Sequence, residues 1–281
     1  MRNLFDTHNH SQFSFDGMNT TVELSAAAAL EKGLGGIAFT DHCDIFIPQE
    51  CIDHEGEHPQ NFDIMAQQAE IDRVQGLMGD RLRILKGIEI GMYPSSRELA
   101  KAVLSQHSFD QVIASIHYID DADPYYGGYF VGKDWKQAYG KYLEAIYEEA
   151  RALEDFDIIG HYDYVARYAP YPQDGIRYKD FSDIFDSIFR YLIENGKGFE
   201  LNTKSSGGSA HSGHGRKTAV DKDILLRYRE LGGEIISLGS DSHRPTGVAE
   251  GFADYAALIR SLGFRWTSHY EKRQLIQSPL V

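Results

Sequence analysis

The stretch "LFDTHNH" (residues 4–10) begins with apolar side chains and ends with two histidines, His8 and His10. On an extended strand, residues two apart point to the same face, so one metal ion could bind both imidazoles. Two exposed histidines on a strand would explain this pattern equally well. The choice between these interpretations depends on whether the rest of the chain supplies further ligands.

Short apolar runs like this one recur along the chain, and their Ile, Val and Phe content is typical of buried strands. They cover residues 4–10, 35–42, 82–91, 110–118, 157–163, 197–203 and 233–243. Helical patterns separate them, with the clearest at 134–154, 180–194, 218–231 and 247–261. A strand followed by a helix, repeated in this way, predicts parallel strands joined by right-handed crossovers.

We expect these units to close into an α/β fold, a distorted seven-stranded (β/α)7 barrel related to the TIM barrel. An open, doubly wound sheet is the alternative. The barrel is favoured because the polar residues described next follow nearly every strand, rather than one switch point. The 281 residues contain no recognisable linker, so we expect a single domain over 1–281.

Nearly every predicted strand ends in an imidazole or a carboxylate where its apolar run stops. In a parallel barrel these ends meet at one mouth, where their side chains converge. One such residue would pass as an ordinary polar strand end, but the agreement of many strands predicts a metal site. With Asp16, which follows the first strand, the predicted ligands are His8, His10, Asp16, His42, Glu89, His117, His161, Asp241 and His243.

The other histidines lie in predicted loops, helices or the C-terminal tail, and we expect them to be exposed to solvent. They are His54, His58, His107, His211, His214 and His269.

Nine ligands are too many for one ion, because zinc typically takes four. We therefore expect two or three divalent ions. Imidazole and carboxylate ligands without thiolate favour Zn, Mn or Fe(II) over Ca or Mg. Three divalent ions outweigh three carboxylates, so the mouth would attract an anion such as phosphate. Clustered metal ions activate water, so we expect phosphoester hydrolysis by a metal-bound hydroxide.

The composition limits the kinds of molecule that we expect the chain to bind. A net charge of −14 and a pI of about 5.3 disfavour nucleic acid and anionic membranes. No run of 18 apolar residues and no secretory signal is seen, so we expect no transmembrane helix. With only Cys43 and Cys51, a reduced cytoplasmic protein is the expectation. The oligomeric state stays open.

The ordered motifs resemble the PHP (polymerase and histidinol phosphatase) family, and most closely its monofunctional histidinol-phosphatase branch. The resemblance rests on Asp-x-His-x-His-Ser-x-x-Ser-x-Asp-Gly over residues 6–17, followed by "TDH", "GIEIG", "SIHY", "GHYD", "ELNT" and "GSDSH". It implies a seven-stranded barrel with three metal ions at its C-terminal face. It also implies hydrolysis of a small phosphate monoester, L-histidinol phosphate above all, in histidine biosynthesis.

Two other functions remain open at this point. The first is a related phosphoesterase that acts on a different small phosphate or on a phosphotyrosine protein. The second is a non-catalytic metal-binding module that kept the ligands. A site that had lost its catalytic function would, however, be expected to lose some of its ligands.

The resemblance also implies roles for single residues. Glu89 would bridge two ions, one held by His8, His10 and Asp241 and the other by His117 and His161. Asp16, His42 and His243 would hold the third. The catalytic set would be Glu89, Asp241, His243 and Arg167. Phosphate would be positioned by Arg167 first, then Arg244 and Lys204, and each of these could instead be a solvated surface cation. Ser115 is two residues before His117 and could hold substrate or water.

Two loops depart from the pattern of the branch or have no clear role. After "ELNT" the branch usually continues with a short apolar and basic stretch, whereas this chain has a longer glycine-rich segment at 204–217. The loop at 43–63 could be a lid whose acids, Glu50, Glu55 and Glu57, meet a cationic amine or imidazolium. A solvated acidic loop is the alternative.

Overall fold

The computed structural model describes residues 1–56, 60–173, 175–206 and 220–280. All strands of the main sheet are parallel, and seven of them follow one another in the order β1-β2-β4-β5-β6-β7-β8, while the short β3 pairs with β4. Their bounds are β1 Phe5–Asn9, β2 Gly36–Phe39, β3 His42–Cys43, β4 Arg83–Gly91, β5 Gln111–Ser115, β6 Ile158–Ile159, β7 Gly198–Asn202 and β8 Ile236–Gly239.

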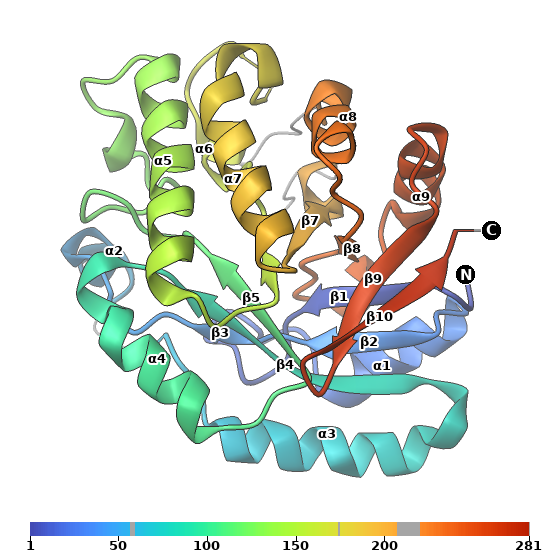
Figure 1. The fold of residues 1–281 in the computed structure, drawn as a ribbon. Coiled ribbons are helices and arrows are strands. Elements are labelled where there is room, and N and C mark those ends of the chain that lie inside the picture. Colours follow the sequence, from blue (N-terminus) through green and yellow to red (C-terminus); the bar gives the residue numbers. More distant parts are fainter. Residues whose placement is uncertain (57–59, 174, 207–219, 281) are drawn as a thin grey trace.

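The helices cover the outside of these strands, with α1, α3 and α4 below them in Figure 1 and α5, α7, α8 and α9 above. They are α1 Val22–Glu31, α2 Gln49–Glu55, α3 Ile64–Met78, α4 Arg97–Gln106, α5 Trp135–Leu153, α6 Tyr164–Tyr168, α7 Ser182–Glu194, α8 Lys222–Glu230 and α9 Phe252–Ser261. Their apolar faces are buried in the hydrophobic core, as Tyr139 and Tyr142 of α5 are.

The sheet closes on itself where β1 and β8 end. The N–H of His10 donates to the carbonyl of Ser242 (2.9 Å), and the N–H of Asp241 donates to the carbonyl of His8 (2.8 Å). All seven predicted strands are present, and the predicted seven-stranded barrel is confirmed rather than the open sheet. The predicted strand 35–42 is interrupted after Phe39 and resumes as β3, and both pieces pair with β4.

The C-terminal tail forms a hairpin that the sequence analysis missed. Strands β9 (Trp266–Glu271) and β10 (Gln274–Pro279) are antiparallel, and Figure 1 shows them in red beside the strands of the barrel. The N–H of Tyr270 donates to Gln111 Oε1 at the start of β5 (3.2 Å). The hairpin therefore covers the amino-terminal ends of the barrel strands.

This hairpin overturns one expectation. His269 was expected to be exposed, but its relative exposure is only 2% and its ring stacks on Phe5 with a centroid distance of 3.6 Å. It is buried because β9 packs against the start of β1. Of the other histidines expected at the surface, His54 is exposed and His107 half-buried, while His58, His211 and His214 lie outside the described residues.

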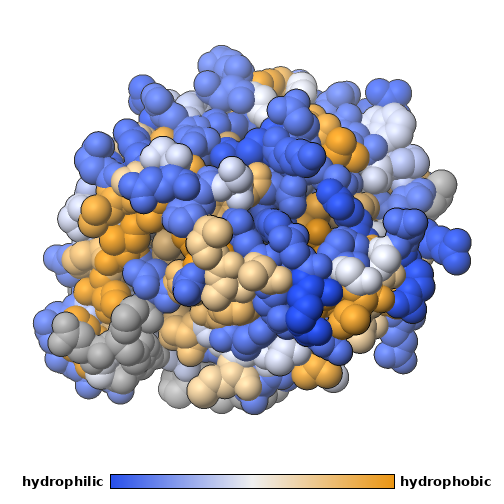
Figure 2. All heavy atoms as spheres, turned by 90° about the horizontal axis from the view of Figure 1, so that it is seen from below, coloured by the Kyte–Doolittle hydropathy of each residue, from blue (hydrophilic) through white to orange (hydrophobic). Residues whose placement is uncertain are grey.

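The surface seen in Figure 2 mixes hydrophilic side chains with separate hydrophobic patches. The exposed large hydrophobic residues of α1, α3 and α4 include Leu24, Met65, Leu77 and Leu99. In the described part of the chain, no helix has the length and apolar character needed to cross a bilayer. The loop at 43–63 contains the short helix α2, and Cys43 and Cys51 are buried and not joined in a disulfide.

Candidate metal centre

Glu89, near the end of β4, lies at the centre of the converging histidines and is fully buried. Its Oε1 accepts a hydrogen bond from Ser115 (2.6 Å) and lies 3.2 and 3.0 Å from Nε2 of His117 and His161. Its other oxygen, Oε2, lies close to three more imidazoles, His42 Nδ1 at 2.9 Å, His8 Nε2 at 3.3 Å and His10 Nε2 at 3.6 Å. One carboxylate therefore faces five histidines.

Three of these imidazoles are held at Nδ1 so that Nε2 faces the centre. His8 Nδ1 lies 2.7 Å from Glu200 Oε1, His10 Nδ1 lies 3.0 Å from Ser14 Oγ, and His117 Nδ1 lies 3.0 Å from both oxygens of Asp44. Because a carboxylate only accepts, Nδ1 of His8 and of His117 carries the hydrogen. When such a ring is neutral, its Nε2 carries a free lone pair that faces the centre. Histidines that bind metal ions have the same tautomer and orientation.

Two carboxylates of the site, Asp44 and Glu200, were not among the residues predicted from the sequence. Asp44 is two residues after His42, and Glu200 interrupts the apolar run of β7, so both carried the same signal as the predicted ligands. Two glycines make room for them, since a Cβ at Gly91 would collide with the carboxylate of Asp44 and one at Gly239 with that of Glu200.

Asp241 follows β8 and lies opposite Glu89. It adopts a positive φ of 51°, a conformation that is uncommon outside glycine. Its Oδ1 lies 3.3 Å from His10 Nε2 and 3.1 Å from Lys204 Nζ, while Oδ2 accepts from Arg167 (3.1 Å). The strained backbone therefore directs this carboxylate toward the histidines, and two cations hold it there.

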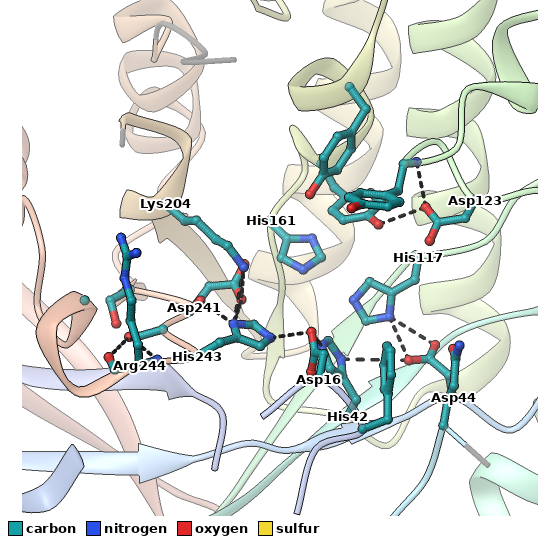
Figure 3. A pocket seen from close by; sticks show the side chains of 18 of the residues that line it. Asp16, His42, Asp44, His117, Asp123, His161, Lys204, Asp241, His243 and Arg244 are labelled. Atoms are coloured by element: carbon teal, nitrogen blue, oxygen red, sulfur yellow. Dashed lines mark hydrogen bonds and ion pairs between the residues drawn. The ribbon is translucent and has the colours of Figure 1, made fainter. Parts of the chain in front are cut away.

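A third group of side chains lies at the outer edge of the centre. Asp16 Oδ2 lies 2.9 Å from His243 Nε2 and 3.9 Å from His42 Nε2. The rings of His42 and His243 each stack on His10, with centroid distances of 4.1 and 4.0 Å, and their own centroids are 5.6 Å apart. Figure 3 shows Asp16, His42 and His243 facing one another at the entrance.

The charges of the site favour a bound cation. Burial raises the pKa of Glu89, but the charges of His8 and His117, among others, outweigh burial and hold it well below its usual range. Burial likewise raises the pKa of Asp241, but Lys204, His10, His8 and His243 together outweigh burial and hold that pKa well below its usual range. Burial lowers the pKa of His8, yet Glu89 and Glu200 raise it well above its usual value. Metal binding at Nε2 would therefore displace a proton.

The donor set fits divalent metal ions. Five buried atoms have no hydrogen bond to any of the described residues: Nε2 of His8, His10 and His243, Nδ1 of His42 and Oε2 of Glu89. Buried polar atoms are normally paired, so atoms that face one another without such bonds indicate a missing ligand. Groups with ligand atoms within 4.8 Å of one another are His8, His10, Asp241; His8, Glu89, His161; His10, His42, His243; and His42, Asp44, His117.

A cavity of about 390 Å³ opens above this centre. Its lining includes the predicted cations Lys204 and Arg244 but neither Arg167 nor Ser115. Arg167 is 4% exposed and lies against Asp241 and Asp163, so the alternative of a solvated cation is wrong for it. Ser115 is buried against Glu89. Among the described residues these two side chains contact carboxylates of the centre and not the cavity.

The two loops singled out from the sequence are only partly described by the structure. Glu50 of the 43–63 loop belongs to α2, and its Oε2 accepts from the N–H of Asp123 (3.3 Å). Glu57 lies outside the described residues, as does most of the glycine-rich segment 204–217. Only the start of that segment is described. There the backbone N–H of Lys204 donates to Oδ1 of Asn202, the last residue of β7.

Comparison with known proteins agrees with this geometry. Residues 6–204 match the family model described as PHP domain. The chain is 31% identical to the histidinol-phosphatase of Lactococcus lactis subsp. lactis (strain IL1403) over 239 residues, 85% of this chain and 83% of that one. The chain belongs to the PHP domain family, in its histidinol-phosphatase branch.

Solved structures of the family extend the comparison. One is histidinol phosphate phosphatase from the same Lactococcus lactis strain, complexed with zinc, L-histidinol and phosphate. It is 27% identical, has a TM-score of 0.86 and covers 98% of this chain and 99% of that chain. A structure from Listeria monocytogenes, 16% identical with a TM-score of 0.73, covers 89% of this chain and shares its fold.

Proposed function

We propose that the chain hydrolyses L-histidinol phosphate to L-histidinol and phosphate with the help of two or three divalent metal ions. The observation that carries this proposal is the convergence of five imidazoles on Glu89, below a cavity lined by Lys204 and Arg244. The relative from Lactococcus lactis, whose structure contains zinc, L-histidinol and phosphate, supports it.

The metal ions would be held by the predicted ligands, with Asp44 and Glu200 behind them. His8, His10 and Asp241 would hold one ion, and His117 and His161 a second, with Glu89 between the two. Asp16, His42 and His243 would hold a third. When bound, such ions supply a water-derived nucleophile at neutral pH and balance the negative charge of a phosphoryl group.

The cations at the cavity would position the phosphate. Lys204 Nζ lies 3.1 Å from Asp241 Oδ1 and 3.4 Å from His243 Nδ1, so a phosphate at the centre would lie beside it. Arg244 follows His243 directly and is half-exposed at the cavity wall, where Figure 3 shows it. We assign phosphate contact to these two residues. We assign Arg167 the role of fixing Asp241, because the two side chains bond directly.

A comparison of arginine variants tests these roles in the metal-loaded enzyme. Arg244→Ala should raise KM for phosphate esters about 10-fold or more, because it removes a charge that contacts the substrate. Arg167→Ala should instead lower kcat and metal content, because Asp241 loses its partner. If both variants changed only KM, the assignment of Arg167 to Asp241 would be wrong.

The function itself is tested with a panel of phosphate esters and protein loaded with Zn, Mn or Fe(II). L-Histidinol phosphate should be hydrolysed with a kcat/KM well above that for p-nitrophenyl phosphate. If the two were turned over equally, a phosphoesterase of other specificity would be the better assignment. If neither were hydrolysed with any of these metals, a non-catalytic module would be favoured.

A further inference from the structure

Asp123 is an acidic side chain on the cavity wall that the metal centre does not use. It lies in the connection between β5 and α5, and its Oδ1 accepts from the N–H of Tyr125 (2.8 Å) and the hydroxyl of Tyr164 (2.9 Å). Within the described ranges, no Lys, Arg or His lies within ion-pair distance of it, and Oδ2 makes no hydrogen bond. Figure 3 shows this carboxylate beside His117.

Aromatic rings surround this carboxylate. Tyr125, Tyr126, Tyr164 and Tyr168 all line the cavity. Their rings meet edge to face, with centroid distances of 5.0 Å for Tyr125–Tyr126, 5.2 Å for Tyr125–Tyr168 and 5.1 Å for Tyr164–Tyr168. Tyrosine faces attract cations, and their apolar surface strengthens nearby charge interactions by excluding water. This wall of the cavity therefore combines a carboxylate with aromatic rings, and both favour a bound cation.

This wall is next to the metal centre. The ring of Tyr164 lies 5.3 Å from that of His161 and 5.6 Å from that of His117, and its hydroxyl reaches Asp123. A single tyrosine thus connects the predicted metal ligands to the carboxylate. A phosphate ester with its phosphoryl group at the centre would extend its alcohol portion along this tyrosine toward Asp123.

We infer that Asp123 and the tyrosines around it bind the positively charged part of the leaving alcohol and thereby select cationic phosphate esters. The inference rests on the proposed function, because L-histidinol phosphate carries an ammonium group and an imidazole. Asp123 is then a specificity residue that contacts substrate away from the reacting phosphorus. Its neighbour Glu50 does not line the cavity, but it accepts from the N–H of Asp123 and so adds negative charge behind this carboxylate.

The environment of the carboxylate agrees with this role. Burial raises the pKa of Asp123 to about 7, and the hydrogen bonds from Tyr125 and Tyr164 only partly oppose that effect. A carboxylate that served the fold alone would be expected to have a cation or further donors beside it. Binding of a cationic group would supply that missing charge.

The test is Asp123→Asn in the metal-loaded enzyme, assayed with L-histidinol phosphate and with p-nitrophenyl phosphate. The asparagine oxygen can still accept from Tyr125 and Tyr164, so the loop is preserved and only the charge is lost. KM for L-histidinol phosphate should rise about 10- to 100-fold, with little change for p-nitrophenyl phosphate, whose aryl portion carries no positive charge. Asp121→Asn, an exposed position in the same connection, is the matched control and should change neither.

Two further esters identify which cationic group is bound. Phosphoethanolamine carries only the ammonium group, and 3-(imidazol-4-yl)propyl phosphate carries only the imidazole. A selective loss with either one supports the inference and names the group. Equal losses with all substrates, p-nitrophenyl phosphate included, or no loss with L-histidinol phosphate, would overturn it. If the unmodified enzyme turned over p-nitrophenyl phosphate but not L-histidinol phosphate, the proposed function would fail instead.

Discussion

The two ends of the barrel bury histidine in opposite ways. At the carboxyl-terminal end, five imidazoles surround Glu89, and the nitrogens of several are buried without a hydrogen bond. At the amino-terminal end, the single imidazole of His269 stacks on Phe5. Its Nε2 likewise has no hydrogen bond within the described part of the chain and lies 3.6 Å from a carboxylate oxygen of Glu271. Burial of histidine is common to both ends. Convergence of several imidazoles with several carboxylates distinguishes the metal centre.

The electrostatics follow the same division. Burial lowers the pKa of His269 to about 4, so at neutral pH this ring is an uncharged aromatic surface. Burial also lowers the pKa of His117, but Asp44 and Glu89 outweigh it and raise that pKa well above its usual value. The amino-terminal end therefore stabilises a neutral ring, whereas at the carboxyl-terminal end the carboxylates around His117 stabilise its charged form.

The largest effect that this comparison predicts is at Glu89. Glu89→Gln keeps the shape but removes the charge that faces five imidazoles, so bound metal and phosphatase activity should be lost together. We expect activity to fall at least about a thousandfold. Metal analysis and phosphate release measure both quantities. Glu250→Gln, on the exposed rim of the cavity, is the matched control. Retention of full metal content by Glu89→Gln would remove this residue from the centre.

Removal of the metal ions should affect only one end of the barrel. A chelator should lower the free energy of unfolding by about 4 kcal/mol for an ion present at a thousand times its Kd. Hydrogen exchange should then accelerate at the carboxyl-terminal ends of β1, β4 and β8 and stay unchanged in β9 and β10. An equal acceleration at both ends would show that the centre and the hairpin are not independent.

A smaller effect is expected from the carboxylates behind the histidines. Glu200→Gln still accepts from the N–H of His161 but no longer balances charge on His8. Metal affinity should fall about 10- to 100-fold, as measured by competition with a chelator. Asp44→Asn should act similarly through His117. The control is Glu194→Gln at the exposed end of α7, and an effect no greater than in this control would contradict the proposed support role.

The smallest effect is at the amino-terminal end. Because the pKa of His269 is about 4 in the folded chain and about 6.5 when unfolded, the unfolded chain binds the extra proton between these values. The free energy of unfolding should therefore fall by about 1 kcal/mol between pH 7 and pH 5.5 through this group. His269→Phe keeps a ring on Phe5 without a titrating group, so denaturant titrations should show less pH dependence. An unchanged pH dependence would show that His269 does not titrate as described.

Much of the site could be predicted from the sequence because its signals are local. Each apolar run ends at a polar residue, and a parallel barrel brings all such ends to one mouth. That reasoning placed all nine predicted ligands at one end of the barrel. It did not find Asp44 or Glu200, whose partners His117 and His8 are 73 and 192 residues away along the chain.

The same limit applies to Arg167 and to the tail. Nothing near Arg167 in the sequence shows that it lies against Asp241, 74 residues later, rather than at the cavity. The hairpin of β9 and β10 has no ligand motif, so its own sequence does not show which strands of the barrel it covers. His269 was therefore placed at the surface, although β9 packs it against Phe5.

The sequence by itself determined the alternation of strands and helices, the barrel and the identity of the residues at its mouth, because these depend on local hydrophobic pattern and on strand direction. Only the tertiary structure decided which nitrogen of each imidazole faces Glu89, which carboxylates hold the histidines from behind and which cations reach the cavity. Those properties depend on contacts between segments that are far apart in the chain. A local sequence pattern contains no information about which distant residue becomes the neighbour of a given side chain.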